Sequence, residues 1–361
     1  MPIRNVCRLL FLLQCVIVFK TTRGGICVME LLSPSNGAGV NTYTTVQVDF
    51  LEKIRKSGTE EALAWLSSVK NGQECSAPKS LVFSWQSSHS KEYVLELAES
   101  PDFTDAYSVV TTDTSFEITN FKVNTTYYWR VNHSQPFSFT TMPNEYRFIY
   151  VDGLLNVRDL GGIGIKQGLL YRGSDVEGEY RLTPKGVDTF CRQLQIRTEL
   201  QLRNEVPDRA GAASFDTNVR YVRLPYRPYK ECFLEEHRRG ICRIMEFLAE
   251  KENYPIYFHC LGGADRTGMI ALFLRSLAGE TDEQIFTDYE LTSLSMYAGG
   301  LAEGAAANGF RSRNSGYFVE FLQLLDSYAP GERLAVKVPL FLLDCGVAEE
   351  TIKKVCKIIK V

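Results

Sequence analysis

Histidine and closely spaced cysteines are scarce in this sequence. The 361 residues include four histidines, and the ten cysteines form no Cys-x-x-Cys pair. Structural zinc sites draw their ligands from closely spaced Cys and His residues. The sequence therefore gives no support to a metal site, and we expect a protein that works without a metal or another cofactor.

Charge imbalance, internal repeats and low-complexity segments are also missing. The net charge is −3, and no long run of one sign occurs. Nucleic-acid-binding proteins carry a clustered basic excess, so a nucleic-acid partner is not expected. The apolar fraction of 45% and the aromatic fraction of 12% are typical of globular proteins with buried cores. A chain of this length predicts two domains.

The N-terminus carries a short apolar run. Arg4 and Arg8 precede the eleven apolar or uncharged residues 9–19, and Lys20 and Arg23 follow them. A bilayer-spanning helix needs about 20 apolar residues, whereas the apolar part of a secretory signal is shorter. Residues 1–25 therefore predict an export signal and a secreted or extracytoplasmic protein. The sequence does not decide whether this segment is cleaved. If it were retained, it would act as a membrane anchor.

The most informative stretch is residues 254–268, Tyr-Pro-Ile-Tyr-Phe-His-Cys-Leu-Gly-Gly-Ala-Asp-Arg-Thr-Gly. An apolar run ends in His259 and Cys260, and after five intervening residues Arg266 opens a segment with helical apolar spacing. This order predicts a buried strand, a tight loop and a helix. The N–H groups at such a helix start bind anions and favour the thiolate form of a nearby cysteine. An arginine fork grips two phosphate oxygens, so the stretch predicts phosphoryl transfer to Cys260.

The Cys-x5-Arg-Thr pattern, preceded by His, resembles that of the cysteine-based protein tyrosine and dual-specificity phosphatases. The resemblance implies that Cys260 attacks phosphorus, that Arg266 binds the phosphate, and that water hydrolyses a phosphocysteine intermediate. His259 is expected to orient the loop. Thr267 is expected to donate a hydrogen bond to the leaving thiolate. The loop residues implied in phosphate binding are Leu261, Gly262, Gly263, Ala264 and Thr267.

Two flanking motifs extend the resemblance over residues 146–361. Residues 156–162 form Asn-x-Arg-Asp-x-Gly-Gly, and residues 171–174 form Tyr-Arg-Gly-Ser. They resemble motifs of a bacterial phosphatase family that includes secreted enzymes acting on phosphotyrosine and on phosphoinositides. From this resemblance we expect Arg158 and Arg172 to bind substrate phosphate and Asp159 to support the site.

The first displacement also needs a general acid for the leaving oxygen. Relatives carry Asp in an Asp-Leu-Arg motif where this chain has Gln201, and an amide cannot supply that proton. Asp265 is the first candidate, because Cys-x4-Asp-Arg-Thr resembles the signature of phosphoinositide phosphatases in which this Asp has an acid–base role. Asp159 and Asp208 are alternatives. Asp265 could equally brace the loop as a carboxylate.

Residue 264 bears on the substrate. Ala264 stands where some lipid-active relatives have Lys, and a basic loop helps to bind multiply phosphorylated inositol rings. Arg158, Arg172 and Arg203 would compensate if they lined the pocket. We therefore expect phosphorylated protein, with phosphotyrosine ahead of phosphoinositide, as substrate. A non-catalytic module for binding phosphorylated ligands or for adhesion is the alternative, suggested by Gln201 and by the N-terminal domain.

Two domains are expected from the pattern of elements. Residues 28–141 show period-two alternation, as at Leu81, Phe83 and Trp85, which predicts an all-β sandwich. The run 121–127 resembles the tyrosine corner of fibronectin type III domains, and helical spacing predicts an insertion at about 45–72. Residues 146–361 alternate strand and helix, which predicts an α/β phosphatase domain with a central sheet flanked by helices.

Overall fold

The structure is a computed structural model that describes residues 18–20, 26–88, 91–206, 211–296 and 309–361. Apart from residues 18–20, the predicted export signal lies outside the described residues. The chain divides into two compact units. The N-terminal unit comprises Met1–Gly39, Leu81–Ile118 and Thr126–Thr140, and the C-terminal unit comprises Val40–Ser80, Thr119–Thr125 and Thr141–Val361.

The N-terminal unit consists of two antiparallel sheets. The first has the order β1-β2-β4-β7, with strands Val18–Lys20, Ile26–Ser33, Leu81–Ser87 and Ser115–Ile118. The second has the order β3-β9-β8-β5-β6, with strands Ala38–Val40, Phe137–Thr141, Thr126–Val131, Tyr93–Ala98 and Tyr107–Thr111.

Aromatic side chains join these two sheets. The ring of Phe83 on β4 meets Trp129 on β8 and Phe139 on β9 edge to face, at centroid distances of 5.1 and 5.9 Å. Phe83 and Trp85 are buried while Val82 before them and Gln86 after them are exposed, as their alternation predicts. The unit is therefore a two-layer β structure, and its likeness to fibronectin type III domains stays a prediction.

The two helices expected inside the sandwich belong instead to the C-terminal unit. Helix α1, Thr45–Ser57, begins with a capping box between Thr44 and Gln47. Helix α2, Thr59–Lys70, follows directly. Their apolar faces are buried with Tyr146, Phe148, Leu291 and Leu294. The sequence placed the helices correctly along the chain but assigned them to the wrong unit, because periodicity shows that a face is buried without showing what covers it.

A mixed sheet lies at the centre of the C-terminal unit. Its order is β10-β11-β12-β15-β13-β14, in which β12, β15, β13 and β14 run parallel and β10 and β11 are antiparallel. The strands are Arg147–Phe148, Arg158–Asp159, Leu170–Gly173, Ile256–His259, Thr198–Gln201 and Arg220–Arg223. The predicted α/β domain with a central sheet is confirmed.

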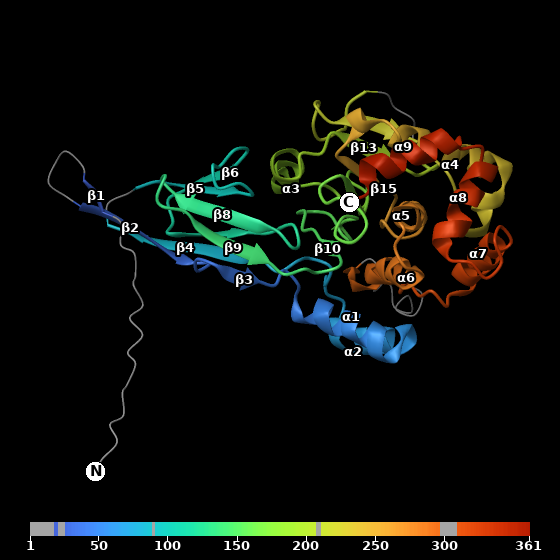
Figure 1. The fold of residues 1–361 in the computed structure, drawn as a ribbon, viewed down its shortest axis with the longest axis horizontal. Coiled ribbons are helices and arrows are strands. Elements are labelled where there is room, and N and C mark those ends of the chain that lie inside the picture. Colours follow the sequence, from blue (N-terminus) through green and yellow to red (C-terminus); the bar gives the residue numbers. More distant parts are fainter. Residues whose placement is uncertain (1–17, 21–25, 89–90, 207–210, 297–308) are drawn as a thin grey trace, which may run out of the picture. The chain divides into compact units, whose positions relative to one another are not determined.

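Helices cover both faces of this sheet (Figure 1). On one side lie α4, α5, α7, α8 and α9, which are Glu235–Leu248, Asp265–Ala278, Gly316–Asp326, Leu334–Asp344 and Glu349–Ile359. On the other lies α3, Pro184–Asp188, capped by Thr183. Strand β15 alternates between the two cores: Ile256 and Phe258 join the first, and Tyr257 joins the second with Phe190. Such two-sided burial makes the strand before Cys260 rigid.

No helix in the described part of the chain is both long and apolar enough to cross a membrane.

Candidate active site

Cys260 stands between a buried strand and a buried helix. Strand β15 ends at His259, and α5 begins at Asp265, so the loop lies at the carboxyl end of a parallel strand, the usual ligand position in such sheets. The N-cap residue Ala264 makes no side-chain hydrogen bond to the first turn. The N–H groups at the start of α5 therefore keep their capacity to bind an anion.

Successive carbonyls of the loop accept hydrogen bonds from outside it. Leu261 O accepts from Asp175 N at 2.8 Å, Gly262 O from Asn156 Nδ2 at 3.0 Å, and Gly263 O from Arg172 Nη2 at 2.7 Å. In a trans peptide the N–H and C=O bonds point in opposite directions. Turning the carbonyls outward thus directs the amides toward the inside of the loop, where they form an anion-binding concavity.

Glycine is required at position 263. Its φ is +67°, and a Cβ there would lie 2.4 Å from the backbone of Gly173 on β12. A side chain would clash with the neighbouring strand as well as strain the backbone. Gly263 therefore lets the loop approach the sheet closely enough for Arg172 to reach its carbonyl.

Arg158 and Arg172 do not line a substrate pocket, and the prediction that they bind substrate is wrong. Both side chains are fully buried behind the loop. Arg172 Nη1 lies 2.7 Å from Asp288 Oδ2, and Arg158 Nε lies 3.4 Å from Asp288 Oδ1. Arg158 Nη1 also donates to Asn156 Oδ1 at 2.5 Å, and so fixes the amide that holds Gly262. These arginines shape the loop from its back.

Asp288 lies on helix α6, Asp282–Glu290. Together with Glu280 it neutralises the buried arginines behind the loop. Arg275 lies 3.3 Å from Asp288 and 2.7 Å from Glu280, and is also buried. Burial opposes ionisation of Asp288, but the three guanidinium groups hold the pKa of its carboxyl well below the usual range. Burial and the neighbouring Arg172 lower the pKa of Arg158 to about 9.

Arg266 lies on the more open side of the loop. Its guanidinium makes two hydrogen bonds of 2.8 Å to the carboxylate of Glu205, a bidentate pair. The Arg266 side chain is 20% exposed and that of Glu205 is 58% exposed. Burial opposes ionisation of Glu205, but the hydrogen bonds from Arg266 lower its pKa overall. Because Glu205 is this exposed, a substrate phosphate can displace its carboxylate from Arg266.

Two other residues hold the side chain of Asp265 in place. Arg311 Nε and Nη2 donate to its two oxygens at 2.9 and 3.0 Å, and Tyr229 OH donates to Oδ1 at 2.5 Å. Burial opposes the charge on Arg311, but the Asp265 carboxylate raises the pKa of that guanidinium. Both oxygens of Asp265 therefore act as hydrogen-bond acceptors in this arrangement, and its side chain remains one-third exposed.

His259 and Thr267 are buried on the inner side of the loop. His259 Nε2 lies 3.1 Å from Glu199 Oε1 on β13, so the ring points into the sheet. The Thr267 hydroxyl has no hydrogen-bond partner among the described residues. It is thus available to a group that enters the loop, such as a leaving thiolate or a bound phosphate oxygen.

The remaining candidates for the general acid are not placed to act as one. Asp159 is buried and accepts hydrogen bonds from Arg147 at 2.6 Å and from the amides of Gly161 and Gly168 at 2.8 and 2.6 Å. It braces the turn between β11 and β12. The side-chain oxygen of Gln201 accepts from Arg203. Asp208 lies outside the described residues.

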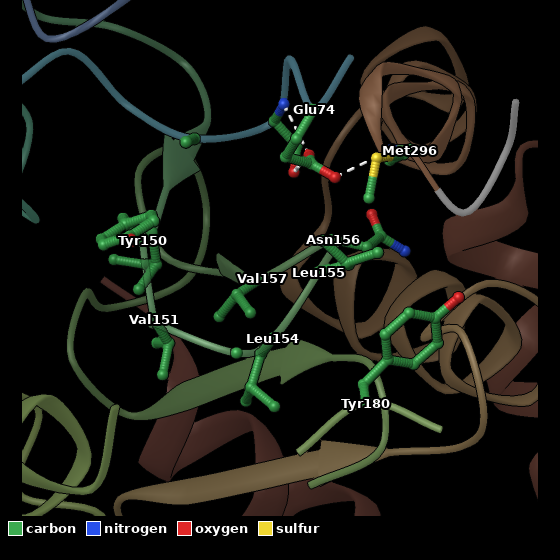
Figure 2. Close-up of a pocket in the computed structure, with 13 residues that line it drawn as sticks. Glu74, Tyr150, Val151, Leu154, Leu155, Asn156, Val157, Tyr180 and Met296 are labelled. Atoms are coloured by element: carbon green, nitrogen blue, oxygen red, sulfur yellow. Dashed lines mark hydrogen bonds between the residues drawn. The ribbon is translucent and has the colours of Figure 1, made fainter. Parts of the chain in front are cut away.

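A cavity of about 350 Å³ adjoins the support of the loop. Figure 2 shows Asn156 and Tyr180 in its wall, with Glu74 and Met296 on another side. Its lining is mostly apolar and contains no Lys or Arg, and the Glu74 carboxylate already accepts from Met296 N at 2.8 Å. The cavity therefore offers no cation to a second phosphate. No cluster of His, Cys, Asp or Glu in the described ranges is arranged to hold a metal.

Comparison with known proteins agrees with this geometry. Residues 149–328 match the model of the tyrosine phosphatase family. That range contains the whole Cys260 loop, and it supports a cysteine-based phosphatase that hydrolyses phosphate esters. No curated protein matches the sequence.

Two solved structures of low similarity contain the catalytic core of the phosphatase Siw14. One is the core catalytic domain of the PP-IP phosphatase Siw14 from Saccharomyces cerevisiae in complex with citrate, with 16% identity over 45% of this chain and 90% of that chain, at a TM-score of 0.29. The other, of the Siw14 catalytic core, has 16% identity over 54% and 89%, at a TM-score of 0.30.

The phosphatase unit contains four residues whose roles the sequence did not reveal. Asn156, Asp288 and Glu205 stand in or near recognisable motifs, so their presence was visible, but no pattern showed which loop atom each one serves. Arg311 stands in no motif and lies 46 residues after its partner Asp265. Only the fold brings the two together.

Proposed function

We propose that this protein hydrolyses aryl phosphate monoesters, with phosphotyrosine in proteins as the substrate class, through a phosphocysteine intermediate. The observation that carries the proposal is the Cys260 loop, whose carbonyls are turned outward, so that its amides face the inside of the loop. Cys260 is the nucleophile, and Arg266 with the loop amides of residues 261–266 binds the equatorial oxygens.

The reaction proceeds in two displacements. The Cys260 thiolate forms a bond to phosphorus while the bond from phosphorus to the phenolic oxygen breaks, and the departing oxygen takes its proton from water. In the second step a water oxygen attacks phosphorus, the sulfur–phosphorus bond breaks, and Asp265 accepts the proton of the water. Thr267 stabilises the leaving thiolate with its unpartnered hydroxyl.

The hydrogen-bond partners of the candidate general acids favour an aryl phosphate as substrate. Asp265 is ion-paired with Arg311, Asp159 is buried in a turn, and Gln201 has no acidic proton. A phenol has a pKa of about 10, so its oxygen leaves as an anion much more readily than an aliphatic alkoxide. Among the described residues, the candidate acids Asp159 and Asp265 are both already engaged by arginine, and such a site is suited to phosphotyrosine and poorly suited to alkyl phosphates.

The distribution of cations disfavours phosphoinositides. Ala264 brings no charge to the loop, and Arg158 and Arg172 are buried behind it. Arg203, the third arginine expected to compensate, donates to Asp175 at 2.7 Å. Multiply phosphorylated inositol needs several accessible cations for its further phosphates, and these three residues do not provide them.

A comparison of substrates tests the proposal. Purified protein is assayed for phosphate release from a phosphotyrosine peptide, a phosphoserine peptide and phosphoinositide vesicles, with Cys260→Ser as the control. We expect Cys260-dependent release with kcat/KM at least about 100-fold higher for phosphotyrosine. Preference for phosphoinositide would refute the substrate class. Tight binding of phosphotyrosine without any release would instead support a non-catalytic module for phosphorylated ligands.

We also propose that the N-terminal unit is a fibronectin type III-like module without chemistry of its own and that the protein is exported. The two antiparallel sheets support the first, and the apolar run 9–19 after Arg4 and Arg8 supports the second. N-terminal sequencing of protein recovered from a secreting host distinguishes a cleaved signal from a retained anchor. Recovery only from the cytosol would refute export.

A further inference from the structure

The helical hairpin α1–α2 makes polar contacts with the segment that carries Arg311. This segment has two described stretches, 290–296 and 309–314, which we call the near and far stretches. Chain residues 45–70 stand between two strands of the N-terminal unit in the sequence, yet they pack on the C-terminal unit, in which the candidate active site lies. The hairpin thus belongs to the unit that contains the site, and its contacts lead toward that site.

Helix α2 and the residues after it hold the near stretch. Lys70 is buried, and its Nζ donates to the carbonyls of Ser293, at 2.8 Å, and Ser295. Cys75 N donates to Leu294 O at 3.0 Å. The Glu74 carboxylate accepts from Ser295 Oγ at 3.1 Å. Three consecutive residues of the stretch are thus fixed by the hairpin and its C-terminal extension.

The first turn of α2 holds the far stretch. Glu60 Oε1 accepts from Ser312 Oγ at 2.7 Å and from Asn314 Nδ2 at 3.1 Å. Thr59 Oγ1 donates to Glu290 Oε1 at 2.8 Å in a buried contact, and the same carboxylate receives Arg313 Nε at 2.8 Å. One helix therefore ties both stretches to each other.

Ser293 connects the near stretch to Arg311. Its hydroxyl accepts from Arg311 N at 2.9 Å and donates to Arg311 O at 3.2 Å. The Arg311 guanidinium then grips both oxygens of Asp265. An unbroken series of contacts runs from Lys70 through Ser293 and Arg311 to the catalytic loop.

We propose that the α1–α2 hairpin is a positioning element of the active site and that Arg311 and Lys70 are positioning residues for Asp265. Arg311 holds both oxygens of the carboxylate and aims it at the site from which water attacks the phosphocysteine. Lys70 and Glu60 hold the backbone that carries Arg311. This inference rests on the proposed function, since it assigns a purpose to Asp265 in the second displacement.

The test compares variants in two backgrounds, the wild type and Asp265→Asn, with para-nitrophenyl phosphate as the probe. We expect Arg311→Gln to lower kcat by about 10- to 100-fold, because misplacement by about 1 Å costs up to about 10² in rate. Lys70→Met, which acts one step further away, is expected to cost less, about threefold to tenfold. In the Asp265→Asn background both substitutions should change kcat by less than about twofold, because the group they position is gone.

Two further variants separate positioning from folding. Arg311→Lys keeps the charge without the fork and should restore part of the kcat lost in Arg311→Gln. Lys337→Met removes a partly buried ion pair between α8 and Asp326 of α7, neither of which is a hydrogen-bond partner of Asp265, and should leave kcat unchanged. Equal losses of kcat in both backgrounds, or no loss for Arg311→Gln, would overturn the inference.

A second measurement does not depend on turnover. Urea midpoints of Arg311→Gln, Asp265→Asn and the double variant should be non-additive, since the pair is coupled directly. If the wild type shows no Cys260-dependent turnover while this coupling is present, the proposed function fails and the contact between the two residues stands, but its catalytic purpose is refuted. Additive midpoints would refute the coupling itself.

Discussion

The arginines on the two sides of the Cys260 loop have opposite surroundings. Arg266 keeps a fifth of its side chain accessible and is paired with the exposed Glu205. Arg158 and Arg172 are fully buried and share Asp288. An exposed ion pair is worth little and can be exchanged for one with phosphate, whereas breaking a buried pair leaves an uncompensated charge. The open side of the loop is thus suited to binding, and the back is suited to holding its shape.

The largest effect on activity is expected on the open side. Arg266→Lys retains the charge but loses the planar fork, so kcat/KM for an aryl phosphate should fall by about 10²- to 10³-fold. The urea midpoint should change little, because the residue lies at the surface. Arg227→Lys, at an exposed pair with Glu231, is the matched control and should keep full activity. A similar loss of activity in both variants would show that Arg266 has no special role in binding phosphate.

The largest effect on stability is expected at the back of the loop. Asp288→Asn leaves three buried guanidinium groups facing the single carboxylate of Glu280, so the free energy of unfolding should fall by about 3–5 kcal/mol. Equilibrium urea unfolding measures the change. Asp188→Asn, at an exposed pair with Arg192, should cost at most about 1 kcal/mol. Equal costs for the two variants would contradict the role given to burial.

Acid should weaken the back of the loop through the same residue. Arginine neighbours hold the pKa of Asp288 below its value of about 3.9 in an unfolded chain. Its contribution to stability is therefore complete above about pH 5 and is lost as the pH falls through about 4 toward the lower folded value. Urea midpoints at a series of pH values should fall more steeply for the wild type than for Asp288→Asn. Parallel curves would show that Asp288 is not the responsible group.

The smallest effect is expected from the carboxylate on the open side. Glu205→Gln removes the competitor for Arg266, so inorganic phosphate should inhibit more tightly, by at most about fivefold, since an exposed pair is worth about 0.2–1 kcal/mol. The difference should shrink at high salt, which screens exposed charges. Weaker inhibition by phosphate in this variant would show that Glu205 assists binding.

The sequence predicted the strand, loop and helix around Cys260 because a short motif and its neighbours determine them. It also located the helices at 45–70 and the central sheet of the C-terminal unit. It could not distinguish Arg158 and Arg172 from Arg266, because a motif records residue type and not burial. The pairing of Asp265 with Arg311 depends on how distant segments fold together, and local patterns carry no information about it.

The most direct test of the account is to find the phosphate on Cys260. The Asp265→Asn variant, in which hydrolysis of the intermediate is slowed, is mixed with a phosphotyrosine peptide, quenched in acid within one turnover and digested for mass spectrometry. The account predicts a phosphate on Cys260 and an initial burst of dephosphorylated peptide equal to the enzyme concentration. Turnover without phosphate on Cys260, or with phosphate on another residue, would contradict it.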